Sequence, residues 1–210
     1  MRLSELAYRQ HDLAAAGQAA ESAYAADRYL ENAPVVLWRL FATSYDQSGL
    51  PNARKWCDEG ARRFPDNARF ARCRILVMTM NGATVEPARL WAAYDDAVRL
   101  TPAPDRAFDG RFDRILLAAA LARVPGMADS ARAVLAGARA DRTIDPQGEL
   151  RGYEAFARVA LGEHEEAIRL LDAYLRENPS HREGFSRINA WWWGSLKQDP
   201  RFVRLIGAAQ

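Results

Sequence analysis

The chain has 210 residues and a formal net charge of +2; Ala occupies 40 positions, whereas Val, Ile and Thr together occupy 20. Because Ala is the best helix former and β-branched residues favour strands, this composition excludes β architectures and predicts an all-α protein. The longest apolar run, Ile115 to Ala122, is too short for a membrane-spanning helix, which needs about 20 residues. The balanced charge also excludes a basic nucleic-acid-binding arm, so we expect no nucleic-acid partner.

The beginning of the chain predicts a helical hairpin over residues 1–31. Charges at Glu5, Arg9 and Asp12 interrupt the apolar centre that a signal peptide requires. We therefore expect either a cytoplasmic protein or a fragment cut from something longer, such as the extracytoplasmic part of a receptor.

The second predicted hairpin, 35–67, carries the most specific pattern in the chain. Its large and small apolar residues recur at fixed intervals and end at a proline: Trp38, Phe41, Ala42, Tyr45, Gly49, Ala53, Cys57, Gly60 and Pro65. The pattern resembles the tetratricopeptide (TPR) repeat, W-x2-L-G-x2-Y, then A-x3-F, then P, which forms two antiparallel helices. In this reading Ala42 and Ala53 let the two helices approach closely, and Pro65 ends the hairpin because it cannot continue a helix.

Three further segments repeat the pattern with different clarity. The segment 148–181 matches well around Leu161-Gly162 and Asn178-Pro179, whereas 68–103 and 111–147 keep only the packing residues. The resemblance to the TPR family implies a right-handed α-solenoid of about five helix-turn-helix hairpins over residues 1–181.

Residues 182–210 depart from the repeat and form a predicted Trp-rich linker and cap. The run from Trp191 to Leu205 is similar to a closing segment, W-x2-L-x2-D-P-R-F-x2-L, that follows TPR arrays in bacterial signalling proteins such as receptor-type serine/threonine kinases. Asp199 and Pro200 suit the N-cap and first position of a final capping helix. We expect Phe202 of that helix to pack on the last hairpin.

The two cysteines, Cys57 and Cys73, each lie eight residues from Pro65. Equal distance from a hairpin turn places them at about the same height on neighbouring helices, which is compatible with a disulfide. Two small core thiols are the alternative. A disulfide would favour an oxidising compartment such as the periplasm.

The three consecutive tryptophans, Trp191, Trp192 and Trp193, are candidates for partner binding. Successive helical residues point in widely different directions, so we expect one cap to be unable to bury all three rings. An exposed Trp is a common interface anchor. The alternative is that Trp193 packs with Leu196 while the other two rings lie half-buried over neighbouring turns.

Polar residues on the expected concave face form the other candidate site. First helices of TPR hairpins line that face, and here they would present Arg39, Thr43 and Asp46 in one copy and Asp113 and Arg123 in a later one. The resemblance implies that this surface binds a peptide or protein partner.

Motifs for catalysis are scarce in this sequence. The three histidines are too scattered for a metal cluster, and no Gly-rich phosphate-binding loop occurs. We therefore expect no catalytic, cofactor-binding or metal-binding residues. The sequence favours a non-enzymatic scaffold or sensor module; the alternatives are a structural subunit of a larger assembly and, third, an enzyme on a helical-repeat scaffold. It leaves the oligomeric state open.

Overall fold

The fold is that of a computed structural model, which describes residues 2–27, 31–139, 141–182, 184 and 190–207. All regular elements in these ranges are helical, as the composition predicts. The α-helices are α1 (Arg2–Arg9), α2 (Leu13–Ala26), α3 (Ala33–Asp46), α4 (Leu50–Arg63), α5 (Ala68–Thr79), α6 (Pro87–Leu100), α7 (Arg106–Leu121), α8 (Ala128–Ala136), α9 (Glu149–Ala160), α10 (His164–Glu177) and α11 (Pro200–Ile206). The short 3₁₀ helices are η1 (Ala103–Asp105), η2 (Pro179–His181) and η4 (Ala190–Leu196).

Local sequence signals explain where several helices begin. The side chains of Asp12, Asn67 and Asp199 accept hydrogen bonds from backbone N–H groups in the first turns of α2, α5 and α11. Proline stands in the first turn of α3, α4, α6 and α11, where its missing N–H costs no intrahelical hydrogen bond. The predicted N-cap and capping helix at Asp199 and Pro200 are confirmed.

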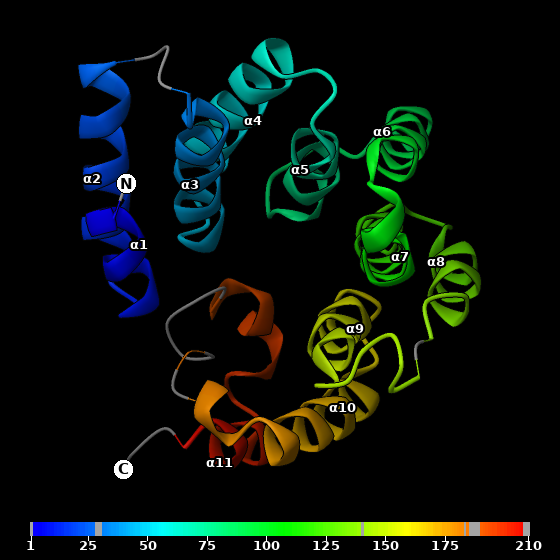
Figure 1. The fold of residues 1–210 in the computed structure, drawn as a ribbon. Coiled ribbons are helices and arrows are strands. Elements are labelled where there is room, and N and C mark those ends of the chain that lie inside the picture. The colour runs from blue at the N-terminus through cyan, green and yellow to red at the C-terminus, as the bar shows by residue number, and fades with distance from the viewer. Residues whose placement is uncertain (1, 28–30, 140, 183, 185–189, 208–210) are drawn as a thin grey trace.

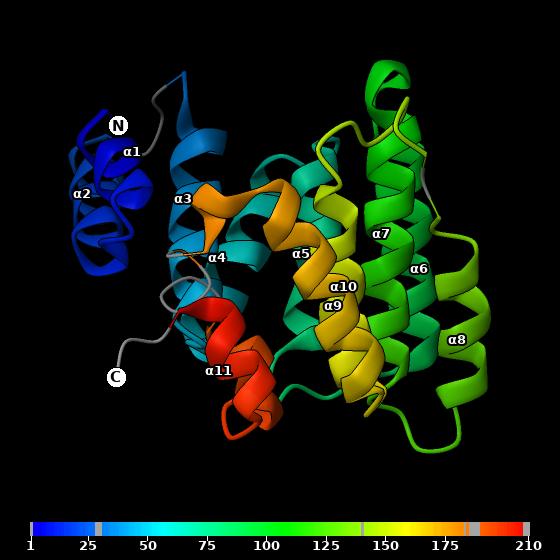
Figure 2. The ribbon, with the colours of Figure 1, turned by 90° about the horizontal axis from the view of Figure 1, so that it is seen from below.

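Helices that follow one another in sequence pack as pairs, α1 with α2, α3 with α4, α5 with α6, α7 with α8 and α9 with α10. The pairs follow an arc from α1 over α4 and α8 to α10 and α11, as Figure 1 shows. Seen from below, α6, α7 and α8 stand side by side with roughly parallel axes (Figure 2). The orange-red segment that contains η4 lies inside the arc rather than on its outer surface (Figure 1).

Helix α7 is the centre of the core. Its residues Ile115 to Leu121 are all buried, because α5, α6, α8 and α9 pack around it. The helix begins at Arg106, five residues before the predicted hairpin start at residue 111, since η1 leads directly into it. Pro102 and Pro104 therefore lie just before α7 and do not prevent it from starting at Arg106.

The second hairpin shows why small residues recur in the pattern. Ala53 of α4 is fully buried. A Cβ atom at Gly60, also on α4, would overlap the ring of Phe70 on α5. The Trp38 ring lies 5.1 Å from the Phe41 ring and 6.4 Å from Phe70. Alanine and glycine at these positions set the distance between helices, and aromatic rings fill the remaining space.

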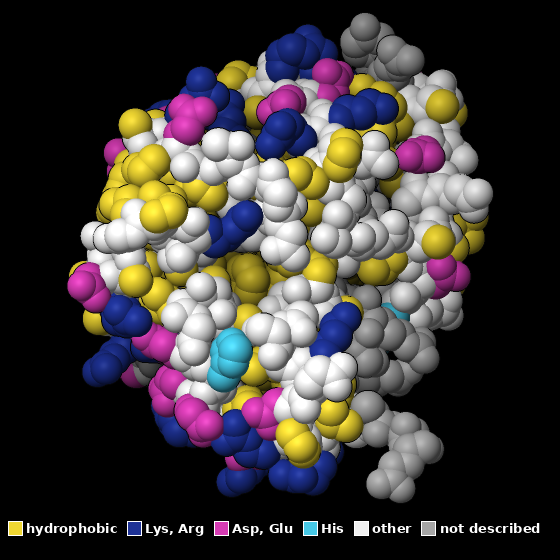
Figure 3. Space-filling model, turned by 180° about the vertical axis from the view of Figure 1, so that it is seen from behind, with side chains coloured by type: hydrophobic (Ala, Val, Ile, Leu, Met, Phe, Trp, Pro, Cys, Tyr) yellow, Lys and Arg dark blue, Asp and Glu magenta, His cyan; other side chains and the backbone are white. Residues whose placement is uncertain are grey.

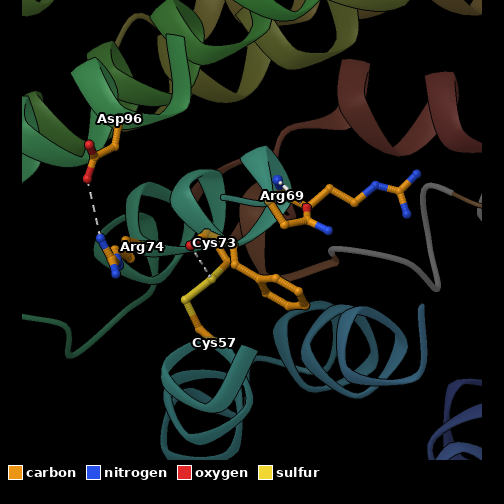
Figure 4. The surroundings of a disulfide bond; sticks show 7 residues. Cys57, Arg69, Cys73, Arg74 and Asp96 are labelled. Atoms are coloured by element: carbon orange, nitrogen blue, oxygen red, sulfur yellow. Dashed lines mark hydrogen bonds and ion pairs between the residues drawn. A yellow bond between two sulfur atoms is a disulfide. The ribbon is translucent and has the colours of Figure 1, made fainter. Parts of the chain in front are cut away.

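Cys57 and Cys73 form a disulfide that joins α4 to α5, with their Cα atoms 5.8 Å apart (Figure 4). The alternative of two free core thiols does not hold in this structure. Both residues are buried, and the link closes the junction between the second and third helix pairs.

Among the described residues, every helix is either too short or too polar to cross a bilayer.

Candidate interaction surface

The Trp-containing segment η4 occupies the inner side of the helix array, between α3 and α9. Trp192 and Trp193 are only 7% and 3% exposed, and Trp191 is partly buried. Two of the three rings are therefore buried and the third is partly buried, so the expectation that one cap cannot bury all three holds for Trp191 alone. A 3₁₀ helix turns about 120° per residue, so the three rings point in different directions. Side chains of α3, α9 and α11 pack against them.

Aromatic rings from both ends of the array surround these tryptophans. Trp192 stacks on Phe156 of α9, with 4.1 Å between ring centroids and 17° between the planes. Trp191 meets Phe156 edge-on at 5.9 Å and Tyr45 of α3 at 5.3 Å. Trp193 lies 6.1 Å from Phe202 of α11. Helix α11 also packs on α10 and Phe202 is buried, in agreement with the predicted packing of the cap on the last hairpin.

The backbone carbonyl and the side-chain hydroxyl of Tyr45 both hold η4. The indole N–H of Trp191 donates to the Tyr45 carbonyl at 2.9 Å, and the Trp192 indole N–H donates to the Tyr45 hydroxyl at 3.2 Å. The Tyr45 hydroxyl also bonds the Thr79 hydroxyl at 2.9 Å. Burial raises the pKa of Tyr45 far above its ordinary value, so this phenol stays protonated.

The predicted concave-face residues of α3 lie beneath the first helix. Arg39 pairs with Glu5, and its guanidinium carbon lies 4.0 Å from the centre of the Tyr8 ring. The Tyr8 hydroxyl donates to Asp46 Oδ2 at 2.6 Å, and Thr43 is 3% exposed. The N-terminal hairpin thus covers these three positions. The expectation that they lie on an open concave face is wrong for this structure.

Asp46 is an unusual group within this contact. Burial raises the pKa of its carboxyl to about 7, and the opposing effects of the Tyr8 hydrogen bond and the Arg39 charge are smaller. The carboxyl therefore changes its charge near neutral pH at the place where α1 meets α3.

The other two predicted residues also make contacts inside the chain. Asp113 is fully buried and accepts two hydrogen bonds from Arg72, which also bonds Asp109 at 2.7 Å. Arg123 donates to the backbone carbonyls of Met78 in the last turn of α5 and of Met80 and Ala83 just after it. Both side chains hold neighbouring helix pairs together, which leaves them unavailable to a partner in this structure.

The sequence reasoning missed a cavity of about 360 Å³ that opens beside the Trp segment. Its described lining comes from the α1–α2 turn, α9, α10, η2 with the residue Gly184 after it, and η4: His11, Glu149, Gly152, Tyr153, Tyr174, Ser180, His181, Gly184, Trp192 and Trp193. The sequence pattern placed Tyr153 on the apolar face of a helix and did not indicate that it lines a cavity. His11 carried no signal, since its place opposite α10 depends on the closure of the arc.

Charged side chains outside this region are mostly arranged as short-range pairs. Acidic and basic side chains are interspersed on the face shown in Figure 3, around apolar patches. Pairs such as Arg62 with Glu59 and Arg169 with Glu166 lie on single helices. No group of three or more metal-ligating side chains occurs among the described residues.

Comparison of the chain with protein-family models, curated proteins and solved structures finds no match.

Proposed function

We propose that this protein is a non-enzymatic interaction module, a right-handed solenoid of about five TPR-like hairpins whose inner surface binds a peptide segment of a partner. The observation that carries the proposal is the seating of η4. A seven-residue segment lies on the inner surface through indole N–H bonds and aromatic contacts. A surface that holds one aromatic segment in this way is suited to hold another of the same chemistry.

In the free chain, η4 is then the internal occupant of the binding surface. An external segment must displace it, and the linked segment has the advantage of a high effective concentration. The resemblance of residues 191–205 to closing segments of bacterial signalling proteins supports a sensor or scaffold role. The Cys57–Cys73 disulfide supports an oxidising compartment for this module.

The test uses a labelled peptide of residues 190–199 added to the full chain, with binding measured by fluorescence anisotropy. In the W191S/W192S variant the internal segment loses both indole contacts, so we expect the peptide to bind at least about tenfold more tightly than to the unmodified chain. Trp91→Ser on α6 is the matched control, because Trp91 is 38% exposed and far from η4 in sequence.

Circular dichroism establishes that each variant is folded. If W191S/W192S does not fold, Trp191→Phe replaces it, since this change removes the bond to the Tyr45 carbonyl and keeps an aromatic ring. Equal affinity for the variant, the control and the unmodified chain would overturn the proposal. A partner that purifies permanently with the chain would instead favour a structural subunit.

A further inference from the structure

The cavity beside η4 has an unusual lining for a protein with 27 arginines. Among its described lining residues are four large aromatic side chains, two histidines and one carboxylate, and none is Arg or Lys. The aromatic residues are Tyr153, Tyr174, Trp192 and Trp193, and the carboxylate is Glu149. With its volume of about 360 Å³, the cavity lies within the range of small-molecule sites, roughly 300–1,000 Å³.

Glu149 differs from its neighbours in having no basic partner among the described residues. On the same helix Glu154 pairs with Arg158, and nearby Glu177 pairs with both Arg142 and Arg151. Glu149 is partly buried, where a carboxylate loses part of its hydration. An ammonium group in the cavity would provide the missing countercharge.

The negative charge of Glu149 disfavours ionisation of two tyrosine hydroxyls beside the cavity. Together with burial, which is the larger cause, it raises the pKa of Tyr174 to about 12. The same two causes, again with burial first, raise the pKa of Tyr153 far above its ordinary value. Both phenols therefore stay neutral, and a neutral phenol ring has an electron-rich face that attracts cations.

The polar atoms of the two tyrosines have different roles. The hydroxyl of Tyr174 on α10 forms a hydrogen bond with Nδ1 of His181 on η2 at 2.5 Å, which holds the Tyr174 ring against η2. The Tyr153 hydroxyl has no hydrogen-bond partner among the described residues, and the Tyr153 ring lies 6.1 Å from the Trp192 ring. Tyr153 thus supplies both a ring and an available hydrogen-bonding group beside the cavity.

We propose that this cavity binds a small organic ammonium ion, with Glu149 as the countercharge and the rings of Tyr153, Tyr174, Trp192 and Trp193 as an aromatic cage. A cation held over aromatic faces is attracted by their quadrupoles, and the attraction grows when the site is shielded from water. Negatively charged ligands are disfavoured, because Glu149 would repel them and the described part of the lining holds no Arg or Lys to compensate. This proposal does not rest on the proposed function, but a peptide that displaces η4 would remove Trp192 and Trp193 from the cage, so we expect the peptide and the cation to compete.

The test is a titration of the full chain with choline, followed by ligand-observed NMR. The probe for comparison is 3,3-dimethylbutanol, which has the same shape without the positive charge. We expect choline to bind and the neutral probe to bind at least about tenfold more weakly. Equal binding of the two probes, or no binding of choline, would overturn the proposal.

A conservative variant locates the site. Glu149→Gln removes the charge and keeps the shape, so we expect choline affinity to fall about tenfold. Glu21→Gln on α2 is the matched control, because Glu21 is exposed and is not part of the cavity lining. Tyr153→Leu, which removes a ring, should also weaken choline, and its melting temperature shows whether the fold is retained. Unchanged choline affinity in Glu149→Gln would sink the assignment even if choline binds elsewhere.

Discussion

The middle of the array and its closure are held together in different ways. In the middle, a disulfide joins α4 to α5, and the buried Arg72–Asp113 pair joins α5 to α7. At the closure, α1 and α3 meet through the partly exposed Arg39–Glu5 ion pair and the Tyr8–Asp46 hydrogen bond. Indole hydrogen bonds and ring contacts hold η4 against α3 and α9. The middle depends on a covalent bond and a buried charge pair, whereas the closure depends on weaker and separable contacts.

This difference predicts that the closure opens before the middle of the array unfolds. Each indole N–H bond contributes about 1 kcal/mol, less than a disulfide or a buried ion pair whose partner is removed. An interaction module of the kind proposed requires that property, because its internal segment has to leave before a partner enters. Four changes to the chain test whether the closure is the weaker region.

The largest effect is expected in the middle, from Asp113→Ala. This change leaves the Arg72 guanidinium largely buried with only Asp109 as a partner, so we expect the free energy of unfolding to fall by roughly 3–5 kcal/mol. Urea unfolding measures it. The control is Glu166→Ala, which removes a partner of the exposed Arg169 and should cost less than about 1 kcal/mol. Similar losses for both variants would contradict the role assigned to burial.

The second effect is a pH dependence at the closure. The folded-state pKa of Asp46 is about 7, above the unfolded value near 4, so the folded chain holds this proton more tightly than the unfolded chain. The contribution of Asp46 to stability is therefore full below about pH 4 and is lost as pH rises toward 7, by at most about 4 kcal/mol.

Asp46→Asn isolates this contribution, because the amide oxygen still accepts a hydrogen bond from Tyr8 and does not titrate. We expect the difference in unfolding free energy between the variant and the unmodified chain to shift in favour of the variant from pH 4 to pH 7. Thermal melts at matched ionic strength measure it. A difference that is constant with pH would show that Asp46 titrates normally.

The third effect is the loss of the disulfide. The bond spans 16 residues, so reduction should lower the free energy of unfolding by about 3 kcal/mol. Urea unfolding with and without a reductant measures the change. The control is the variant with both Cys57 and Cys73 replaced by Ala, which should be insensitive to reductant. A stability that does not respond to reductant in the unmodified chain would contradict the bond.

The smallest effect is expected for Trp191→Phe at the closure. The ring contacts with Tyr45 and Phe156 are largely kept, while the bond to the Tyr45 carbonyl is lost. That carbonyl still accepts from the Ser48 N–H, so the cost should be only about 1 kcal/mol. Chemical denaturation measures it, and a loss as large as that of Asp113→Ala would mean that the closure is not the weaker region.

The predictions from sequence succeeded where neighbours along the chain decide the structure. The 35–67 pattern placed Ala53 in the core, and the equal distances from Pro65 placed Cys57 and Cys73 at the same height on neighbouring helices. Asp199-Pro200 marked the start of α11. The candidate site was predicted less well. Arg39 and Asp46 were assigned to an open surface, but α1 covers them. No local pattern shows which surface of a helix a distant hairpin will cover.

By itself, the sequence determined the all-helical class, the order of the helices and the small residues at which they touch. These features depend on helix propensity, capping and packing within a few dozen residues. Only the tertiary structure decided that the tryptophans point inward and that Glu149 shares a cavity with His11. Trp191 and its partner Tyr45 are 146 residues apart. Contacts at that range depend on the summed curvature of every helix pair between them, which no single segment encodes.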